Sequence, residues 1–139
     1  MLLVIDCGNT NIVFGIYDGQ HIQCVWRVET HPLPTVDKLR SALNLSAERI
    51  TGVVIASVVP DALVPLEDFA SSIGHKPLIV GGGDVNFGIM VDVPNPSQVG
   101  PDRIVNAAAC ASMGTVPAIV VDFGTATTFD VVLEGVDAP

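Results

Sequence analysis

The chain has 139 residues, of which 49% are hydrophobic, and its 6 Lys+Arg against 15 Asp+Glu give a formal net charge of −9. This length suits one ordinary domain or slightly less than two small ones. The acidic excess argues against nucleic-acid binding and against a polybasic membrane anchor, because both need clustered positive charge. No segment approaches the roughly 20 apolar residues that a membrane-spanning helix requires. An anionic substrate would therefore be held by backbone N–H groups, a few placed cations or a metal.

The cysteines and the N-terminus indicate a cytoplasmic protein. Cys7, Cys24 and Cys110 are isolated in apolar or strand-like segments and form neither a CxxC pair nor a Cys/His spacing typical of zinc sites. We therefore expect three reduced thiols in the core. The apolar N-terminal stretch lacks a preceding basic region and is interrupted by Asp6, which argues against a signal peptide.

The first half of the chain alternates apolar strands with short helices. Period-two and continuous apolar runs indicate strands, and the YDGQ segment (17–20) is a hairpin signal. Thr35 and Asp61 each precede apolar residues at helical spacing, so each can cap a helix. The expected strands are 2–5, 12–17, 21–29, 52–60 and 76–82.

The second half begins with an irregular stretch and ends with two strands. Residues 81–101 are rich in Gly, Pro and Asn and form a linker or a substrate loop, since long loops in compact domains are usually functional. A helix is expected at 102–113, and its small residues imply close packing. Strands are expected at 118–123 and 127–135. Two strands alone are marginal and would expose an apolar face.

One pattern occurs twice along the chain. VIDCGNTNIVFGIYDG (4–19) and VVDFGTATTFDVVLEG (120–135) both place Asp-x-Gly at the end of an apolar strand and before another. The pattern predicts an α/β fold in which residues 1–101 form a complete domain of mixed sheet with flanking helices. Residues 102–139 would then be a hinge helix and the first two strands of a second, similar domain.

The first of these turns has the composition of a phosphate–metal site. A strand-ending carboxylate such as Asp6 can hold Mg²⁺, and Gly8 permits a positive φ and close approach of a ligand. Successive N–H groups in such a turn bind anions, and Asn9, Thr10 and Asn11 add neutral donors. An ordinary Asx-type turn is the alternative, but two equivalent turns favour a phosphate clamp. Neither a Walker A loop nor a GxGxxG motif is present.

The GPDR segment (100–103) opens the predicted third helix. An acidic residue is favoured at a helix N-terminus by the macrodipole, which accounts for Asp102 but not for the cation Arg103. A substrate carboxylate would account for Arg103 through a bidentate pair. Asp102 could then accept the proton of a substrate hydroxyl as it attacks a phosphoryl group.

Three motifs resemble those of one family. DCGNTNIVFG (6–15), NPSQVGPDRIVNA (95–107) and VVDFGTATTFDVV (120–132) resemble, in this order and over the whole chain, the type III pantothenate kinases, once also described as Bvg accessory factors. That family belongs to the ASKHA superfamily of actin-like ATPases and sugar kinases, with two ribonuclease H-like domains around a cleft. The resemblance implies transfer of the ATP γ-phosphate to the 4′-hydroxyl of pantothenate, the first step of coenzyme A synthesis. It also implies Mg²⁺, a monovalent cation (K⁺ or NH₄⁺) and a homodimer.

The resemblance also implies roles for single residues. Asp102 matches the proton acceptor, Asp122 the monovalent-cation ligand and Thr125 an ATP contact, while Asp6 lies near the Mg²⁺ of the phosphate site. The ATP-phosphate motif matches Asp6, Cys7, Gly8, Asn9, Thr10, Asn11, Ile12 and Val13, and the pantothenate motif matches Gly100, Pro101, Asp102 and Arg103.

The sequence departs from the family pattern at three places. Val93-Pro94 stands where many members carry an aromatic residue before Asn-Pro, and Pro101 stands where Ala is common, although proline suits the first turn of a helix. The chain also ends two strands into the expected second domain. A non-catalytic nucleotide-binding or regulatory module and an inactive fragment are therefore alternatives. A sugar kinase is a further alternative, from which GPDR before a small-residue helix points away.

Several remaining residues receive structural interpretations. We expect Trp26 to anchor the core or an interface, and Asp130 to be either an ordinary strand-edge carboxylate or a cleft-facing one. The GGGD segment (81–84) frees the chain after the fifth strand rather than binding phosphate. The histidines are expected at the surface or at strand edges, without a metal site: His21, His31 and His75.

Overall fold

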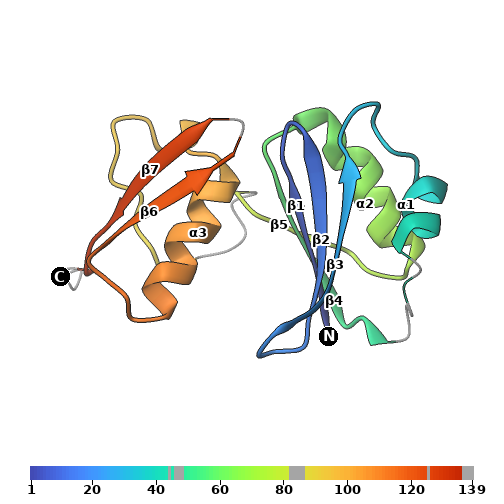
Figure 1. Ribbon diagram of the computed structural model, residues 1–139, viewed down its shortest axis with the longest axis horizontal. Helices are drawn as coiled ribbons and strands as arrows, with labels where there is room; N and C mark the ends of the chain where they lie inside the picture. Colours follow the sequence, from blue (N-terminus) through green and yellow to red (C-terminus); the bar gives the residue numbers. More distant parts are fainter. Residues whose placement is uncertain (44, 46–48, 82–86, 125, 136–139) are drawn as a thin grey trace. The chain divides into compact units, whose positions relative to one another are not determined.

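The computed structural model describes residues 1–43, 45, 49–81, 87–124 and 126–135. The chain divides into two compact units, Met1–Val80 and Gly81–Pro139 (Figure 1). Each unit contains its own sheet. The domain limits expected from the sequence, 1–101 and 102–139, stay a prediction. Among the described residues, no helix combines the length and apolar character needed to span a bilayer.

The first unit is built on a mixed five-stranded sheet of order β3-β2-β1-β4-β5. The first strand pairs antiparallel with the second and parallel with the fourth, which confirms the expected mixed α/β class. The fourth and fifth strands are both shorter than predicted, and for the fourth the reason is that Pro60 begins a 3-10 turn, η2 (Pro60–Ala62). The strands are β1 (Leu2–Cys7), β2 (Asn11–Tyr17), β3 (Ile22–Glu29), β4 (Gly52–Ser57) and β5 (Leu78–Ile79).

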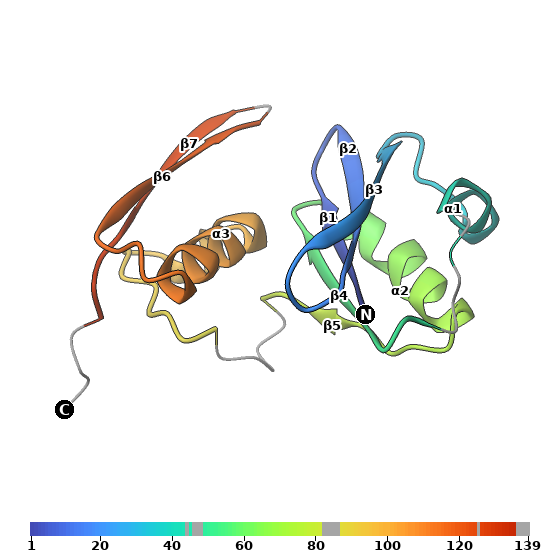
Figure 2. The same ribbon diagram turned by 60° about the horizontal axis from the view of Figure 1, so that its bottom comes forward.

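Two helices, α1 (Val36–Leu43) and α2 (Leu63–Ser72), lie on the same face of this sheet (Figure 2). Thr35 caps α1 as predicted, since its Oγ1 accepts a hydrogen bond from the Lys38 N–H at 3.3 Å. The predicted cap at Asp61 is wrong. Asp61 lies inside η2, and α2 begins after Ala62 without a side-chain cap.

The core of the first unit fills the space between the sheet and the two helices. Alternate residues of β1 and β2 are buried there, as the period of a strand requires. Phe14 of β2 meets Phe69 of α2 edge to face, with ring centroids 6.1 Å apart. Cys24 corrects the expectation of three core thiols, because it lies exposed on β3 at the sheet edge, whereas Cys7 and Cys110 are buried. Of the histidines, His21 and His31 are exposed and His75 is half-buried.

The second unit packs helix α3 (Pro101–Ser112) against a hairpin of β6 (Ala118–Phe123) and β7 (Thr127–Val132). The hairpin alternates in burial, so one face meets α3 and the other is open to solvent. The helix begins at Pro101, one residue earlier than predicted, and β7 ends at Val132 rather than 135. The exposed apolar face was expected and consists of Ile119, Val121, Phe123, Phe129, Val131 and Leu133.

Candidate functional site

The turn between β1 and β2 is held by a residue from the end of β3. The Gly8 N–H donates to the Asn11 carbonyl at 3.0 Å, which closes the turn. Thr30 donates twice to the same turn, from its Oγ1 to the Gly8 carbonyl at 2.7 Å and from its N–H to the Thr10 carbonyl at 3.0 Å. Thr30 is completely buried. Sequence reasoning missed it, because a threonine before a proline-rich loop carries no local signal of this long-range contact.

The predicted phosphate-binding residues of the β1–β2 region differ in how exposed they are. Asp6, Asn9 and Thr10 are exposed, whereas Cys7 and Ile12 are completely buried in the core. Gly8, Asn11 and Val13 lie half-buried between these extremes. Cys7 and Ile12 can therefore offer only backbone groups to a ligand. Burial also raises the pKa of the Cys7 thiol, which disfavours the nucleophilic thiolate.

Gly8 does not use the positive φ that a glycine permits. The glycines with positive φ among the described residues include Gly19 in the β2–β3 turn, at 108°, but not Gly8. A Cβ placed on Gly8 would meet the Asn11 carbonyl oxygen at 3.4 Å, an ordinary van der Waals contact. Neither backbone strain nor crowding within the chain therefore requires glycine at this position. Close approach of a ligand to Gly8 stays a prediction.

Asp102 lies in the first turn of α3, where its carboxylate bonds the helix backbone. Gly100 is the extended N-cap and Pro101 the first helical residue, which needs no N–H there. The Asp102 Oδ1 accepts the Arg103 N–H at 2.8 Å, and the same N–H also donates to the Gly100 carbonyl at 3.1 Å. Asp102 is half-buried, and within the described part of the chain no hydrogen bond occupies its Oδ2.

Arg103 is paired with a carboxylate of the chain itself. Its Nε donates to the Asp130 Oδ1 at 2.7 Å, and one terminal nitrogen of the guanidinium also contacts that oxygen. This hydrogen bonding raises the pKa of Arg103. The strand register places Asp130 opposite Val120, on the hairpin face that meets α3. Asp130 thus contacts Arg103 on the α3 side of the hairpin, and whether it also faces a cleft stays a prediction.

Asp122 lies on the same hairpin face, at the second Asp-Gly turn. Its Oδ2 accepts a long hydrogen bond from the Asn106 Nδ2 at 3.4 Å, and the Gly124 N–H donates to the Ala126 carbonyl at 3.1 Å. Thr125, the predicted ATP contact, lies outside the described residues. Over the described ranges, no three His, Cys, Asp or Glu side chains converge as a metal site. The cation role of Asp122 therefore stays a prediction.

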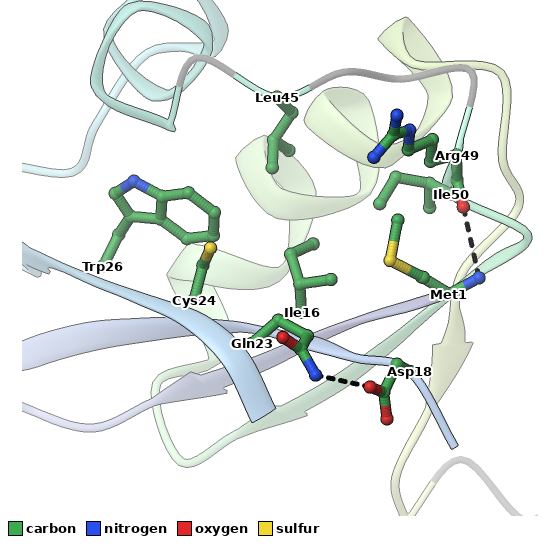
Figure 3. Close-up of a pocket in the computed structure, with 9 residues that line it drawn as sticks. All are labelled: Met1, Ile16, Asp18, Gln23, Cys24, Trp26, Leu45, Arg49 and Ile50. Atoms are coloured by element: carbon green, nitrogen blue, oxygen red, sulfur yellow. Dashed lines mark hydrogen bonds between the residues drawn. The ribbon is translucent and has the colours of Figure 1, made fainter. Parts of the chain in front are cut away.

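A cavity of about 510 Å³ lies elsewhere in the first unit (Figure 3). Its wall includes Met1, Ile16, Trp26 and Ile50, with Arg49 at its rim. The Met1 terminal nitrogen donates to the Arg49 carbonyl at 3.1 Å. Met1 lies just before β1, whereas the predicted phosphate turn follows the end of β1. None of the predicted site residues lines the cavity. Trp26 is half-buried and packs at the edge of the core, as expected.

Comparison with known proteins identifies the family. The family model for type III pantothenate kinase matches residues 2–136. The type III pantothenate kinase of Moorella thermoacetica is 46% identical over 142 residues, covering 96% of this chain and 56% of the relative. Those of an Exiguobacterium species and of Geobacter sulfurreducens are 44% and 46% identical, covering 93% and 95% of this chain and 54% of each relative. The chain spans about half the length of these curated relatives, and it belongs to the type III pantothenate kinase family.

Proposed function

We propose that this chain forms the part of a phosphotransferase that holds the ATP phosphates and the pantothenate hydroxyl. The reaction moves the ATP γ-phosphate to the 4′-hydroxyl of pantothenate, the first step of coenzyme A biosynthesis. The observation that carries the proposal is the family match over residues 2–136, which contains all three sequence motifs. Because the chain spans about half of its relatives, its own turnover is the property to test.

The β1–β2 turn is the proposed phosphate site. Its exposed polar residues are Asp6, near the end of β1, and Asn9 and Thr10, which follow that strand; alternate residues of β1 are buried in the core. Thr30 fixes two of the turn's carbonyls, so the neighbouring N–H groups keep their positions without a ligand. Such preorganised dipoles bind a polyphosphate without relying on cationic side chains. Asp6 would hold Mg²⁺ through the phosphates, since hard cations take oxygen ligands.

The start of α3 is the proposed pantothenate site. Asp102 combines a half-buried position with one carboxylate oxygen that the described chain leaves available, which suits a proton acceptor for the attacking hydroxyl. Arg103 keeps guanidinium donors beyond those that Asp130 occupies, and its side chain is 37% exposed. Gly100 and Pro101 would line the same site through their backbone.

The resemblance to type III pantothenate kinases also supports proposals for the superfamily, the monovalent cation, a further ATP contact and the oligomeric state. The two Asp-Gly turns support a ribonuclease H-like unit followed by the start of a second one, in the manner of the ASKHA superfamily. Asp122 would hold K⁺ or NH₄⁺, and Thr125 would contact ATP. We also propose a homodimeric enzyme of the cytoplasm, since family members usually share their substrate site with a partner subunit.

A coupled ADP-release assay tests the proposal on this chain, with Mg²⁺, ATP and K⁺ or NH₄⁺, in the presence and absence of pantothenate. We expect ADP release that depends on pantothenate. Nucleotide binding measured by calorimetry, without pantothenate binding or turnover, would refute the kinase proposal and favour a non-catalytic nucleotide-binding module. Omitting each cation in turn tests the metal assignments in the same assay.

A further inference from the structure

We propose that Asp130 is the positioning residue of Arg103 in the pantothenate site. Arg103 was expected from the sequence to meet a substrate carboxylate, whereas its pairing with Asp130, 27 residues later in the chain, is seen only in the fold. The inference rests on the proposed function, because it concerns how the arginine of that site is held. It adds a residue of the second strand of the hairpin to a site otherwise formed by the start of a helix.

The geometry of the pair fixes the guanidinium plane. The Arg103 Nε and a terminal nitrogen both reach one oxygen, the Asp130 Oδ1. Two donors of a rigid planar fork meeting one acceptor leave the side chain little freedom to rotate. The remaining guanidinium N–H groups make no hydrogen bond within the described residues, so they stay available to a ligand.

The burial of the pair is unequal, and this inequality separates the roles of its members. The Asp130 side chain is 14% exposed, whereas that of Arg103 is 37% exposed. The Asp130 carboxylate therefore lies further inside and supports Arg103. The Arg103 guanidinium lies further outside, where a ligand can reach it.

Asp130 also lowers the stability of the fold, which a residue with only a structural role would not be expected to do. Its Oδ2 is buried and has no hydrogen-bond partner in the described part of the chain. A buried, unpartnered polar atom destabilises a fold, and an apolar residue packed there would avoid the cost. The same hairpin face carries Asp122 and Thr128 beside Val120 and Val132, so both polar and apolar side chains lie there. A carboxylate at position 130 is explained if its role is to hold Arg103 in one orientation.

Calorimetric titration of the unaltered chain and its variants with pantothenate, and separately with Mg²⁺–ATP, tests the inference. Asp130→Ala removes the anchor, while Asp130→Asn keeps an oxygen acceptor but loses the charge. Glu134→Gln is the matched control, because it removes one exposed acidic charge just after the same strand. We expect Asp130→Ala to weaken pantothenate binding about 10-fold or more and Asp130→Asn less, as for a lost charged hydrogen bond. ATP affinity should change less than about 2-fold in every variant, the scale of surface substitutions.

The other possible outcomes refute either the positioning role of Asp130 or the proposed function. A folded Asp130→Ala protein with unchanged pantothenate affinity and a lower melting temperature would make the pair structural only and refute the positioning role. If Asp130→Ala does not fold, the same comparison with the isosteric Asp130→Asn decides. Equal loss of pantothenate and ATP affinity would also refute it, since a positioning role is specific to one ligand. Failure of the unaltered chain to bind pantothenate would instead overturn the proposed function, and the inference with it.

Discussion

Thr30→Val should loosen the β1–β2 turn and destabilise the first unit. The substitution keeps the shape of a completely buried side chain but removes the Oγ1–H that donates to the Gly8 carbonyl at 2.7 Å. That carbonyl is partly buried, so losing its donor costs about 1–3 kcal/mol of unfolding free energy. The backbone bond from the Thr30 N–H to the Thr10 carbonyl remains, which limits the loss to one interaction.

Urea unfolding followed by the fluorescence of Trp26 measures this cost, because Trp26 packs against the same core. Thr51→Val is the matched control. It removes a hydroxyl that donates to the Met1 carbonyl at 3.0 Å and accepts from the Met1 terminal nitrogen at 3.3 Å, but at an exposed position, so the change should stay within about 0.5 kcal/mol. We also expect faster exchange of the Gly8 amide and weaker nucleotide binding in Thr30→Val alone. Equal stability of the two variants would refute the argument that burial makes the Thr30 hydroxyl important.

Three further predictions concern the proposed sites and the hairpin turn. Asp102→Asn should lower phosphoryl transfer about 10²–10⁴-fold without changing ATP affinity, as expected for loss of a general base; equal turnover would remove that role. Arg103→Ala should raise the KM for pantothenate far more than that for ATP, and it should lower the melting temperature because Asp130 loses its partner. The backbone N–H groups of His21 and Gln20 lower the pKa of Asp18, so its contribution to stability is present above about pH 4 and is lost as the pH falls through the folded pKa. The difference in unfolding free energy between the unaltered protein and Asp18→Asn should accordingly shrink on acidification, and a difference independent of pH would contradict this.

Sequence patterns predicted the elements of this fold better than their ends. The strands at 118–123 and 127–135 appear as β6 and β7, and the turn signal YDGQ lies between β2 and β3 with Gly19 at positive φ. The fourth strand is shorter than its apolar run because a proline lacks the N–H for the ladder and begins η2. Hydrophobicity therefore located the strand, while backbone hydrogen bonding decided where it stops.

Sequence reasoning missed Thr30 and the contact between Asp130 and Arg103 for the same physical reason. Thr30 reaches Gly8 across 22 residues, and Asp130 reaches Arg103 across 27. Neither pair has a spacing that a helix or a tight turn would produce, so only the paired strands and the helix–hairpin packing bring them together. In each case the group proposed to meet the ligand is held by a residue from another element, the completely buried Thr30 or the 14% exposed Asp130. A motif does not reveal such supporting contacts, because they belong to the tertiary structure.

An acidic chain needs local geometry to bind the two anionic substrates proposed for it. With 6 Lys+Arg against 15 Asp+Glu, long-range electrostatics repels phosphate and carboxylate groups, so local geometry must outweigh it. At the β1–β2 turn the proposed donors are backbone N–H groups, and Thr30 rather than a cation holds the turn that carries them. At the start of α3 one arginine is fixed by Asp130, which lowers the entropy lost when it binds a ligand. Preorganisation thus substitutes for net charge, and loosening either support should weaken binding more than adding a distant lysine could restore.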